Sequence, residues 1–307
     1  MSTQCRGGAL LAIVTLLSIS QAHADMSRPQ STRPTAPAAN KAGAKEPAIE
    51  VQHQQSQNGW RVAETVNFRL FHQQTRAMAE AVLQMAERTR RAQQRKWFGR
   101  VDADWDPKCR IYLYSSAEDY SEATGAPINP GGGHTDVRTD EGRALSRCIH
   151  LHGQRSFLLK GVVPHEVTHA VLAGRLSSGR VPRWADEGMA ILAETQTQID
   201  VHFRYLPRWR ADDALFNMRT LVEMRDYPEP RSIGPFYAQS VSLVDFLTRE
   251  KGAPRFADFV RDGERGGYAA SLRKHYGWSF AELERRWMRH AFYRDKDAET
   301  EAANGGG

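Results

Sequence analysis

The chain has 307 residues and a formal net charge of +6. This excess is modest, and the arginines of the C-terminal part lack the interleaved aromatic side chains of a nucleic-acid-binding platform. A solvated helix face explains these arginines better, so we predict no nucleic-acid partner. An alternative is that the net positive charge attracts the chain weakly to anionic polymers of a cell envelope.

Residues 1–24 have the pattern of a secretory signal peptide. Arg6 gives a positive start, the apolar run from Ala9 to Ile19 is too short to span a bilayer, and residues 22–24 form a small-x-small cleavage site. We therefore predict export to a bacterial periplasm or secretion, with no stable membrane insertion after cleavage. An uncleaved membrane anchor is the alternative. Cys5 precedes the apolar run, which argues against a lipoprotein signal.

Residues 25–58 are rich in Pro, Ala, Gln and Ser and contain few large apolar side chains. Such a segment buries too little surface to offset its ordering entropy, so we predict a flexible linker. The domain proper then covers 59–293, and 294–307 is predicted to be a disordered tail. A domain of roughly 235 residues is large enough for one sizeable core or for two lobes with a cleft between them.

The first half of this domain mixes strand and helix patterns. Segments rich in β-branched and aromatic residues predict strands at 60–72, 109–114 and 144–151. Apolar residues at helical spacing predict a helix over 75–98, and the chain after residue 182 is mainly helical. We expect Pro235 to open one of the later helices and Ser279 to cap the last one. The fold class predicted is α+β, with an N-terminal mixed sheet and a mainly helical C-terminal lobe.

The most specific motif is His-Glu-x-x-His at 165–169, embedded in an apolar segment that predicts a buried helix. On a helix, His165 and His169 lie on one face, so their imidazoles can bind one tetrahedral Zn²⁺. Glu166 points about 100° away from the first histidine, where it can reach a water on the open metal position. Buried polar groups need partners, and metal binding provides them, whereas a solvated polar helix face is the alternative.

A catalytic zinc needs a third protein ligand. Glu187 follows the second histidine in a predicted helix over 183–194 that can fold back against the first one. Trp184 and Gly188 beside it favour close helix packing over an ordinary surface carboxylate.

The motif at 165–169 followed by the segment 182–188 resembles the gluzincin branch of zinc metallopeptidases, in particular the thermolysin-like, peptidase MA type domains of bacterial envelope proteins. The resemblance implies a zincin-like fold and one zinc per chain. It also assigns the metal to His165, His169 and Glu187, and the general base to Glu166. It extends more loosely to an early strand at 68–72 and a later helix at 236–240.

Two departures from the family are visible. Some gluzincins place an aspartate four residues after the glutamate ligand, where this chain has Ile191. Another residue must then orient the histidines, and the candidates are Asp186 and Glu194. A missing orienting group weakens metal binding by about 10–100-fold. The Gly-x-Met-x-Asn segment of the aminopeptidase branch has no match, so we do not predict an aminopeptidase.

The resemblance also implies an oxyanion donor from the C-terminal lobe, for which we choose Tyr237. A packed core tyrosine is the alternative for this residue, and the less favoured donors are His150, His152 and His202. Strand 144–151 is a candidate to pair with an extended substrate backbone.

The function predicted is therefore hydrolysis of peptide bonds in a peptide or protein substrate. A zinc-binding scaffold without turnover and a zinc amidase acting on cell-wall peptides are the alternatives. The sequence does not indicate an oligomeric state.

Signal cleavage removes Cys5 and leaves Cys109 and Cys148 in an oxidising compartment. We expect a disulfide between them, which in the chain-entropy model stabilises the fold by roughly 3–4 kcal/mol. Two separate buried thiols are the alternative.

Overall fold

The computed structural model describes residues 48–128, 131–140, 143–173, 175–176 and 181–293. The predicted signal peptide, the predicted tail and most of the predicted linker lie outside these residues.

The N-terminal half contains a six-stranded mixed sheet with the strand order β1-β2-β3-β4-β6-β5. Neighbours β3, β4 and β6 are parallel, whereas β1-β2-β3 and β6-β5 pair antiparallel. The strands are β1 (Gln52–Gln57), β2 (Trp60–Glu64), β3 (Phe68–His72), β4 (Cys109–Leu113), β5 (Gly132–Asp140) and β6 (Arg143–His152).

The predicted linker boundary at residue 58 is too late. Residues 52–57 form β1, which pairs with β2 at the sheet edge. The composition hid this strand because it has almost no apolar side chains: as an edge strand it is held by backbone hydrogen bonds, and five of its six residues are exposed.

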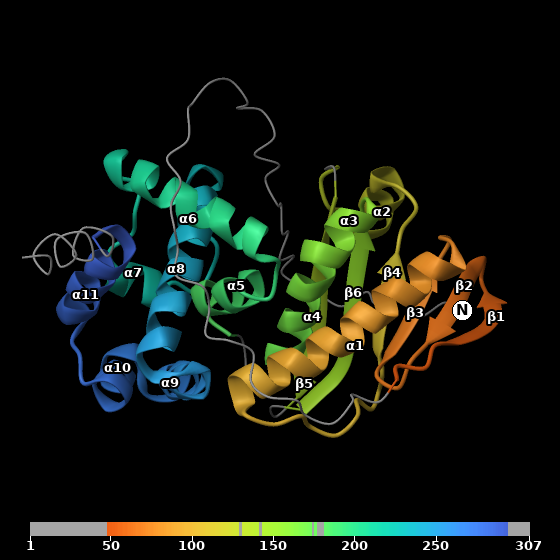
Figure 1. Cartoon of the computed structure of the whole chain (residues 1–307), viewed down its shortest axis with the longest axis horizontal. Helices are drawn as coiled ribbons and strands as arrows, with labels where there is room; N and C mark the ends of the chain where they lie inside the picture. Colours follow the sequence, from red (N-terminus) through yellow and green to blue (C-terminus); the bar gives the residue numbers. More distant parts are fainter. Residues whose placement is uncertain (1–47, 129–130, 141–142, 174, 177–180, 294–307) are drawn as a thin grey trace, which may run out of the picture.

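Helix α1 (Arg76–Phe98) covers one face of the sheet, and its length matches the predicted helix (Figure 1). Thr75 caps its start by accepting from the Met78 amide, and Gly99 ends it in the left-handed conformation at φ 72°. The other sheet face carries aromatic side chains from β4 and β6 and is covered by the short helix α2 (Ala117–Thr124), whose Tyr120 packs against Tyr114.

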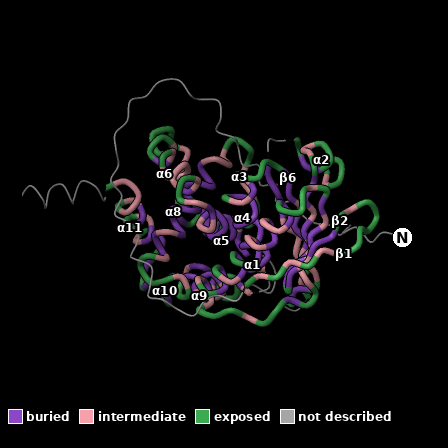
Figure 2. The backbone as a smooth tube through the Cα atoms, turned by 45° about the vertical axis from the view of Figure 1, so that its right-hand side comes forward, coloured by how far each residue is buried: buried purple, intermediate pink, exposed green. Residues whose placement is uncertain are grey.

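The same sheet face is also covered, beside α1, by a continuous helical segment made of α3 (Arg155–Phe157), the π-helix η1 (Leu158–Val162) and α4 (Val163–Leu172). Every residue of α4 is buried. Helix α5 (Arg183–Ile191) packs against it, and both run through the buried centre of the molecule (Figure 2).

The C-terminal half is helical (Figure 1). It has its own core, built around Trp184, Phe236, Phe256 and Trp287. The helix predicted to open at Pro235 begins at Ile233, and Ser279 caps the last helix by accepting from the Glu282 amide at 3.2 Å. A mixed sheet followed by a mostly helical part thus agrees with the predicted fold class. The helices are α6 (Gln196–Ala211), α7 (Met218–Glu223), the 3₁₀ turn η2 (Pro230–Ser232), α8 (Ile233–Lys251), α9 (Ala253–Gly266), α10 (Tyr268–Tyr276) and α11 (Phe280–Phe292).

Among the described helices, none combines the length and the apolar character that crossing a bilayer requires.

The predicted disulfide is wrong: Cys109 and Cys148 are both buried and are not joined. They lie on the neighbouring parallel strands β4 and β6, but Cys148 pairs in register with Arg110 rather than with Cys109. Because side chains alternate between the two faces of a strand, the two thiols point to opposite faces of the sheet. The compartment and the loop length were therefore not sufficient grounds for predicting a disulfide, because the two side chains are on opposite sheet faces.

Candidate metal centre

Helices α4 and α5 bring together the three predicted metal ligands. The ligand atoms of His165, His169 and Glu187 all lie within 4.8 Å of one another, and all three residues are buried. Glu187 Oε2 is 3.3 Å from His165 Nε2 and 3.8 Å from His169 Nε2. Atoms about 2.0–2.1 Å from a tetrahedral zinc are roughly 3.3–3.4 Å apart, so small side-chain adjustments suffice to bind the ion.

A buried carboxylate faces the far nitrogen of each histidine. His165 Nδ1 lies 2.8 Å from Glu194 Oε1, and His169 Nδ1 lies 2.8 Å from Asp186 Oδ1. If each Nδ1–H donates to its carboxylate, the lone pair of Nε2 points at the metal position. The two residues that the sequence offered as orienting groups therefore both take this place. Helix α5 ends at Ile191 rather than at Glu194, and the turn that follows brings the Glu194 carboxylate back to His165.

Glu166 lies on the β5 side of α4. Thr135 Oγ1 of β5 donates to Glu166 Oε2 at 2.7 Å and also to the Glu166 carbonyl at 2.9 Å. The backbone of Gly133 comes equally close: a Cβ there would lie 3.0 Å from Glu166 Cγ and 2.8 Å from the His150 carbonyl oxygen. Strand β5 thus holds one carboxylate oxygen of Glu166 and leaves the other unbound.

Among the described residues, four buried polar atoms of Glu166 and the three predicted ligands have no hydrogen-bond partner, and Glu194 Oε2 beside them has none either. The four atoms are His165 Nε2, Glu166 Oε1, His169 Nε2 and Glu187 Oε2. A buried polar atom left without a partner costs about 1–3 kcal/mol. Three of the four are the atoms that a zinc ion would bind, and the donor set of two imidazoles and one carboxylate is that of a catalytic zinc site. The residues present therefore fit the ion.

The electrostatics of the centre follow from its burial. Burial alone would lower the pKa of His165 and His169, but the carboxylates around them outweigh it and raise both. Burial raises the pKa of Glu166, against the opposing charges of the two histidines. For Glu187 the histidines outweigh burial and lower the pKa. Glu187 therefore stays ionised, as a carboxylate ligand must be, while the pKa of Glu166 is shifted in the direction that a general base requires.

Sequence reasoning missed Tyr227, which follows α7 in an irregular segment. Its hydroxyl donates a short hydrogen bond to Glu187 Oε1, the carboxylate oxygen that faces away from the histidines. Arg183 lies over its ring, 4.9 Å from the centroid. No local pattern marks this tyrosine, because its neighbours Asp226 and Pro228 indicate only a turn.

Tyr237 lies on α8 close to this group. Its ring centroid is 6.5 Å from that of Tyr227 and 6.4 Å from that of His202 on α6. Burial and the nearby Glu187 raise the pKa of Tyr237 well above its usual value, so its hydroxyl keeps its proton at neutral pH. His202 is half-buried, and this burial lowers its pKa.

His150 and His152 are not near the metal centre. Both alternate with Ile149 and Leu151, which pack into the core beneath α4, so their side chains lie on the other face of β6. Strand β6 itself lies between β4 and β5, so both of its edges are used. The prediction that 144–151 pairs with a substrate is therefore wrong, and the edge strand beside α4 is β5.

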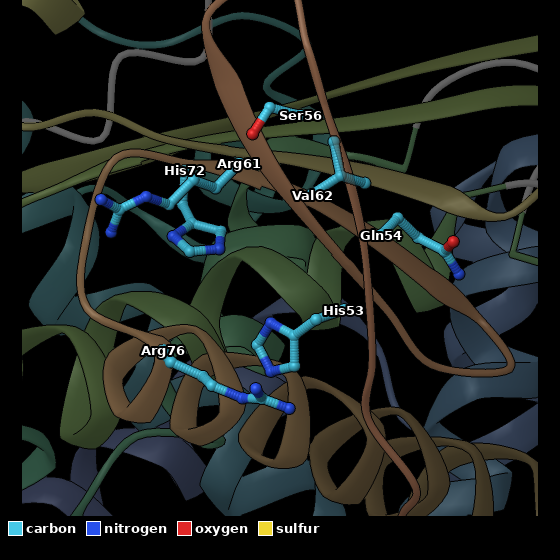
Figure 3. Close-up of a pocket in the computed structure, with 7 residues that line it drawn as sticks. All are labelled: His53, Gln54, Ser56, Arg61, Val62, His72 and Arg76. Atoms are coloured by element: carbon cyan, nitrogen blue, oxygen red, sulfur yellow. The ribbon is translucent and has the colours of Figure 1, made fainter.

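A separate pocket of about 200 Å³ lies between the first strands and the start of α1 (Figure 3). None of the metal-centre residues lines it. Two of its side chains already have partners: His53 Nε2 lies 3.0 Å from Glu80 Oε1, and Arg61 donates to the Gln74 carbonyl. The pocket is lined by His53, Gln54, Ser56, Arg61, Val62, His72 and Arg76.

No family model matches the chain, and no curated protein matches it. Among solved structures it is similar to the M1 zinc metallopeptidase from Deinococcus radiodurans, with 12% identity and a TM-score of 0.35 over 78% of this chain and 51% of that one. A point mutant of the same enzyme gives 11% identity and a TM-score of 0.37 over 80% and 52%. The chain therefore spans about half the length of these structures.

Proposed function

We propose that the protein is a zinc-dependent peptidase of the gluzincin type, with a zincin-like fold. The observation that carries this proposal is the set of four partnerless buried atoms, contributed by His165, Glu166, His169 and Glu187. Without a metal, Glu187 Oε2 faces the two Nε2 atoms only as an ion pair, at 3.3 Å and 3.8 Å, and Glu166 Oε1 has no partner among the described residues. One zinc ion and one water would satisfy all four atoms.

His165, His169 and Glu187 would hold the ion, with Glu194, Asp186 and Tyr227 keeping them in place. Bound there, zinc would polarise a substrate carbonyl and lower the pKa of an attacking water towards about 7. Glu166 Oε1 takes the proton of that water, and Thr135 keeps the carboxylate pointing at it. Tyr237 donates its hydroxyl hydrogen to the developing oxyanion.

The edge strand β5 supports a peptide as the substrate. Its backbone runs beside Glu166 and its outer edge carries no partner strand in the described sheet. An extended peptide can add to such an edge through backbone hydrogen bonds, with its scissile bond beside the metal centre. The signal-peptide pattern of residues 1–24 adds the proposal that the enzyme acts in the bacterial envelope.

The test uses purified mature protein, metal analysis and a random peptide library. We expect zinc at the α4–α5 centre, loss of it in His165→Ala/His169→Ala, and chelator-sensitive peptide cleavage. Glu166→Gln should keep zinc and fold while lowering cleavage by at least about 10²-fold. Glu122→Gln, an exposed glutamate on α2, is the matched control and should change nothing.

Three outcomes would contradict the proposal. Full activity of Glu166→Gln rejects the mechanism. Zinc at this centre without any cleavage by the wild type favours the scaffold alternative. Cleavage of cell-wall peptides alone, with no activity on ordinary peptides, favours the amidase.

A further inference from the structure

The pocket at the edge of the sheet gathers two arginines and two histidines between the first strands and the start of α1 (Figure 3). The antiparallel register pairs Arg61 of β2 with His72 of β3, and directly paired residues project to the same face of a sheet. His72 shares its face with Leu70, which packs in the core beneath α1. His53 of β1 and Arg76, the first residue of α1, line the same pocket. Three strands and one helix thus supply its basic side chains.

His72 supplies a buried hydrogen-bond acceptor to this pocket. The residue is 1% exposed, and its Nδ1 lies 3.2 Å from the carbonyl oxygen of Gln74. Because a carbonyl only accepts, Nδ1 carries the hydrogen, and the neutral ring has a bare lone pair at Nε2. Burial lowers the pKa of His72, and the charges of Arg61 and His53 add to this against the hydrogen bond to Gln74, so the ring stays neutral. Nε2 is buried and has no hydrogen-bond partner among the described residues, so it requires a ligand that donates a hydrogen.

The two arginines bring positive charge to the same pocket. Arg61 donates from one terminal nitrogen to the Gln74 carbonyl at 3.1 Å, and Arg76 donates from Nε to Glu80 Oε1 at 3.1 Å. A guanidinium has five N–H groups, so each arginine keeps others that can bind an anion. Glu80 also lies 3.0 Å from His53 Nε2, but it does not line the pocket, and none of the lining residues is acidic. The two guanidinium groups outnumber this carboxylate, so the pocket has an excess of positive charge.

The start of α1 strengthens this preference for an anion. The first N–H groups of a helix have no partner within it, and the helix dipole gives this end a partial positive charge. The first turn of α1 contains no acidic residue to offset that charge, and its first residue lines the pocket. Helix starts bind phosphate and carboxylate groups for this reason. Because His72 Nε2 also requires a donor, the pocket selects an anion that carries a hydrogen of its own.

We propose that this pocket binds a small oxyanion that keeps a hydroxyl hydrogen, such as hydrogen phosphate. Its charged oxygens accept hydrogen bonds from Arg61 and Arg76, and its hydroxyl donates to His72 Nε2. The volume of about 200 Å³ is sufficient for such a group. Sulfate has the same tetrahedral shape but no hydrogen at neutral pH, so one of its oxygens would face the lone pair of Nε2. The site is separate from the proposed peptidase centre, because none of the residues of that centre lines the pocket.

Calorimetric titration of the whole purified protein with sodium phosphate or sodium sulfate, at equal ionic strength, tests the proposal. We expect about one phosphate per chain with a dissociation constant of about 1 mM or lower. Sulfate should bind at least about 10-fold more weakly, because the buried Nε2 of His72 then lacks a donor. His72→Asn can still donate to the Gln74 carbonyl but has no Nε2, so it should lose the preference for phosphate over sulfate.

Arg61→Gln provides a second variant, since Arg61 is exposed and tolerates the change. It should weaken both anions by at least about 10-fold, because a charge-assisted hydrogen bond is lost. Arg88→Gln removes the same charge from an exposed position of α1 and should leave both unchanged. The proposal is overturned if phosphate does not bind, if sulfate binds as tightly, or if Arg88→Gln weakens phosphate as much as Arg61→Gln. Phosphate on the metal centre would bind equally in the wild type and both pocket variants, and that outcome overturns the proposal too.

Discussion

Two pairs of histidines lie on opposite sides of strand β5. The residues of one pair are neighbours on a helix, and those of the other are neighbours across two strands. On one face, His165 and His169 are four residues apart on a helix; on the other, His134 and His150 are cross-strand partners from β5 and β6. The helical pair can be recognised from the sequence, because residues four apart on a helix lie on the same face. The strand pair depends on a register that no local pattern contains.

The two pairs also differ in what supports them. Buried carboxylates face the Nδ1 atoms of the α4 pair, whereas tyrosine hydroxyls face those of the strand pair. A carboxylate raises the basicity of a histidine ligand more than a neutral hydroxyl does. The α4 histidines are therefore the pair arranged for a metal, whereas His134 and His150 form a stack of parallel rings 4.6 Å apart.

The largest effect that sharpens this contrast is expected from Tyr237. Its Phe variant should lower kcat by about 10²–10³, since one oxyanion donor is worth roughly 2.7–4 kcal/mol, with little change in KM or zinc content. Steady-state kinetics and metal analysis measure this. Tyr227→Phe is the matched control and should weaken zinc binding instead, because its hydroxyl bonds the ligand Glu187.

If Tyr237→Phe leaves kcat within a few-fold and shifts only the melting temperature, Tyr237 is a packing residue. His202 then becomes the next donor to test.

An intermediate effect is expected from the supporting carboxylates. Glu194→Gln or Asp186→Asn should weaken zinc at the α4 centre by about 10–100-fold, because the far nitrogen of one histidine loses its carboxylate. Competition with a chelator of known affinity measures the change. Tyr120→Phe is the control, because its hydroxyl contacts His134 on the other sheet face, and equal weakening of the α4 zinc by this variant would contradict the role given to Glu194 and Asp186.

A smaller effect is expected from Gly133, where the backbone of β5 lies between the two pairs. A methyl group there meets Glu166 Cγ at 3.0 Å and the His150 carbonyl oxygen at 2.8 Å. Gly133→Ala should therefore destabilise the fold by about 1–3 kcal/mol, the usual cost of overpacking. Denaturant unfolding measures it. Gly266→Ala has no atom within 4 Å of the new methyl and should be neutral or slightly stabilising.

The smallest effect concerns the thiols, for which the structure predicts no response to reductant. Metal-free protein unfolded without reductant should be alkylated at both Cys109 and Cys148, and adding reductant beforehand should not change the peptide masses. A mass for a linked Cys109–Cys148 peptide pair would show that the two thiols do not lie on opposite faces of the sheet.

Tertiary structure decided what local patterns could not contain. The polar edge strand β1 lacks apolar alternation, and its pairing with β2 depends only on backbone groups. Tyr227 reaches Glu187 from 40 residues away along the chain. The order that puts β6 inside the sheet and β5 at its edge moved the candidate peptide-binding strand from 144–151 to 132–140.

The sequence by itself determined the α4 motif, the candidate third ligand Glu187 and the mixed fold class, since a helix repeats every 3.6 residues and its spacing fixes which residues share a face. Only the folded chain decided which nitrogen of each histidine faces a carboxylate or a tyrosine, and on which face of the sheet each cysteine lies. The physical reason is that strand parity and register are fixed by partners distant in sequence. A shift of one residue would turn every side chain of a strand to the other face.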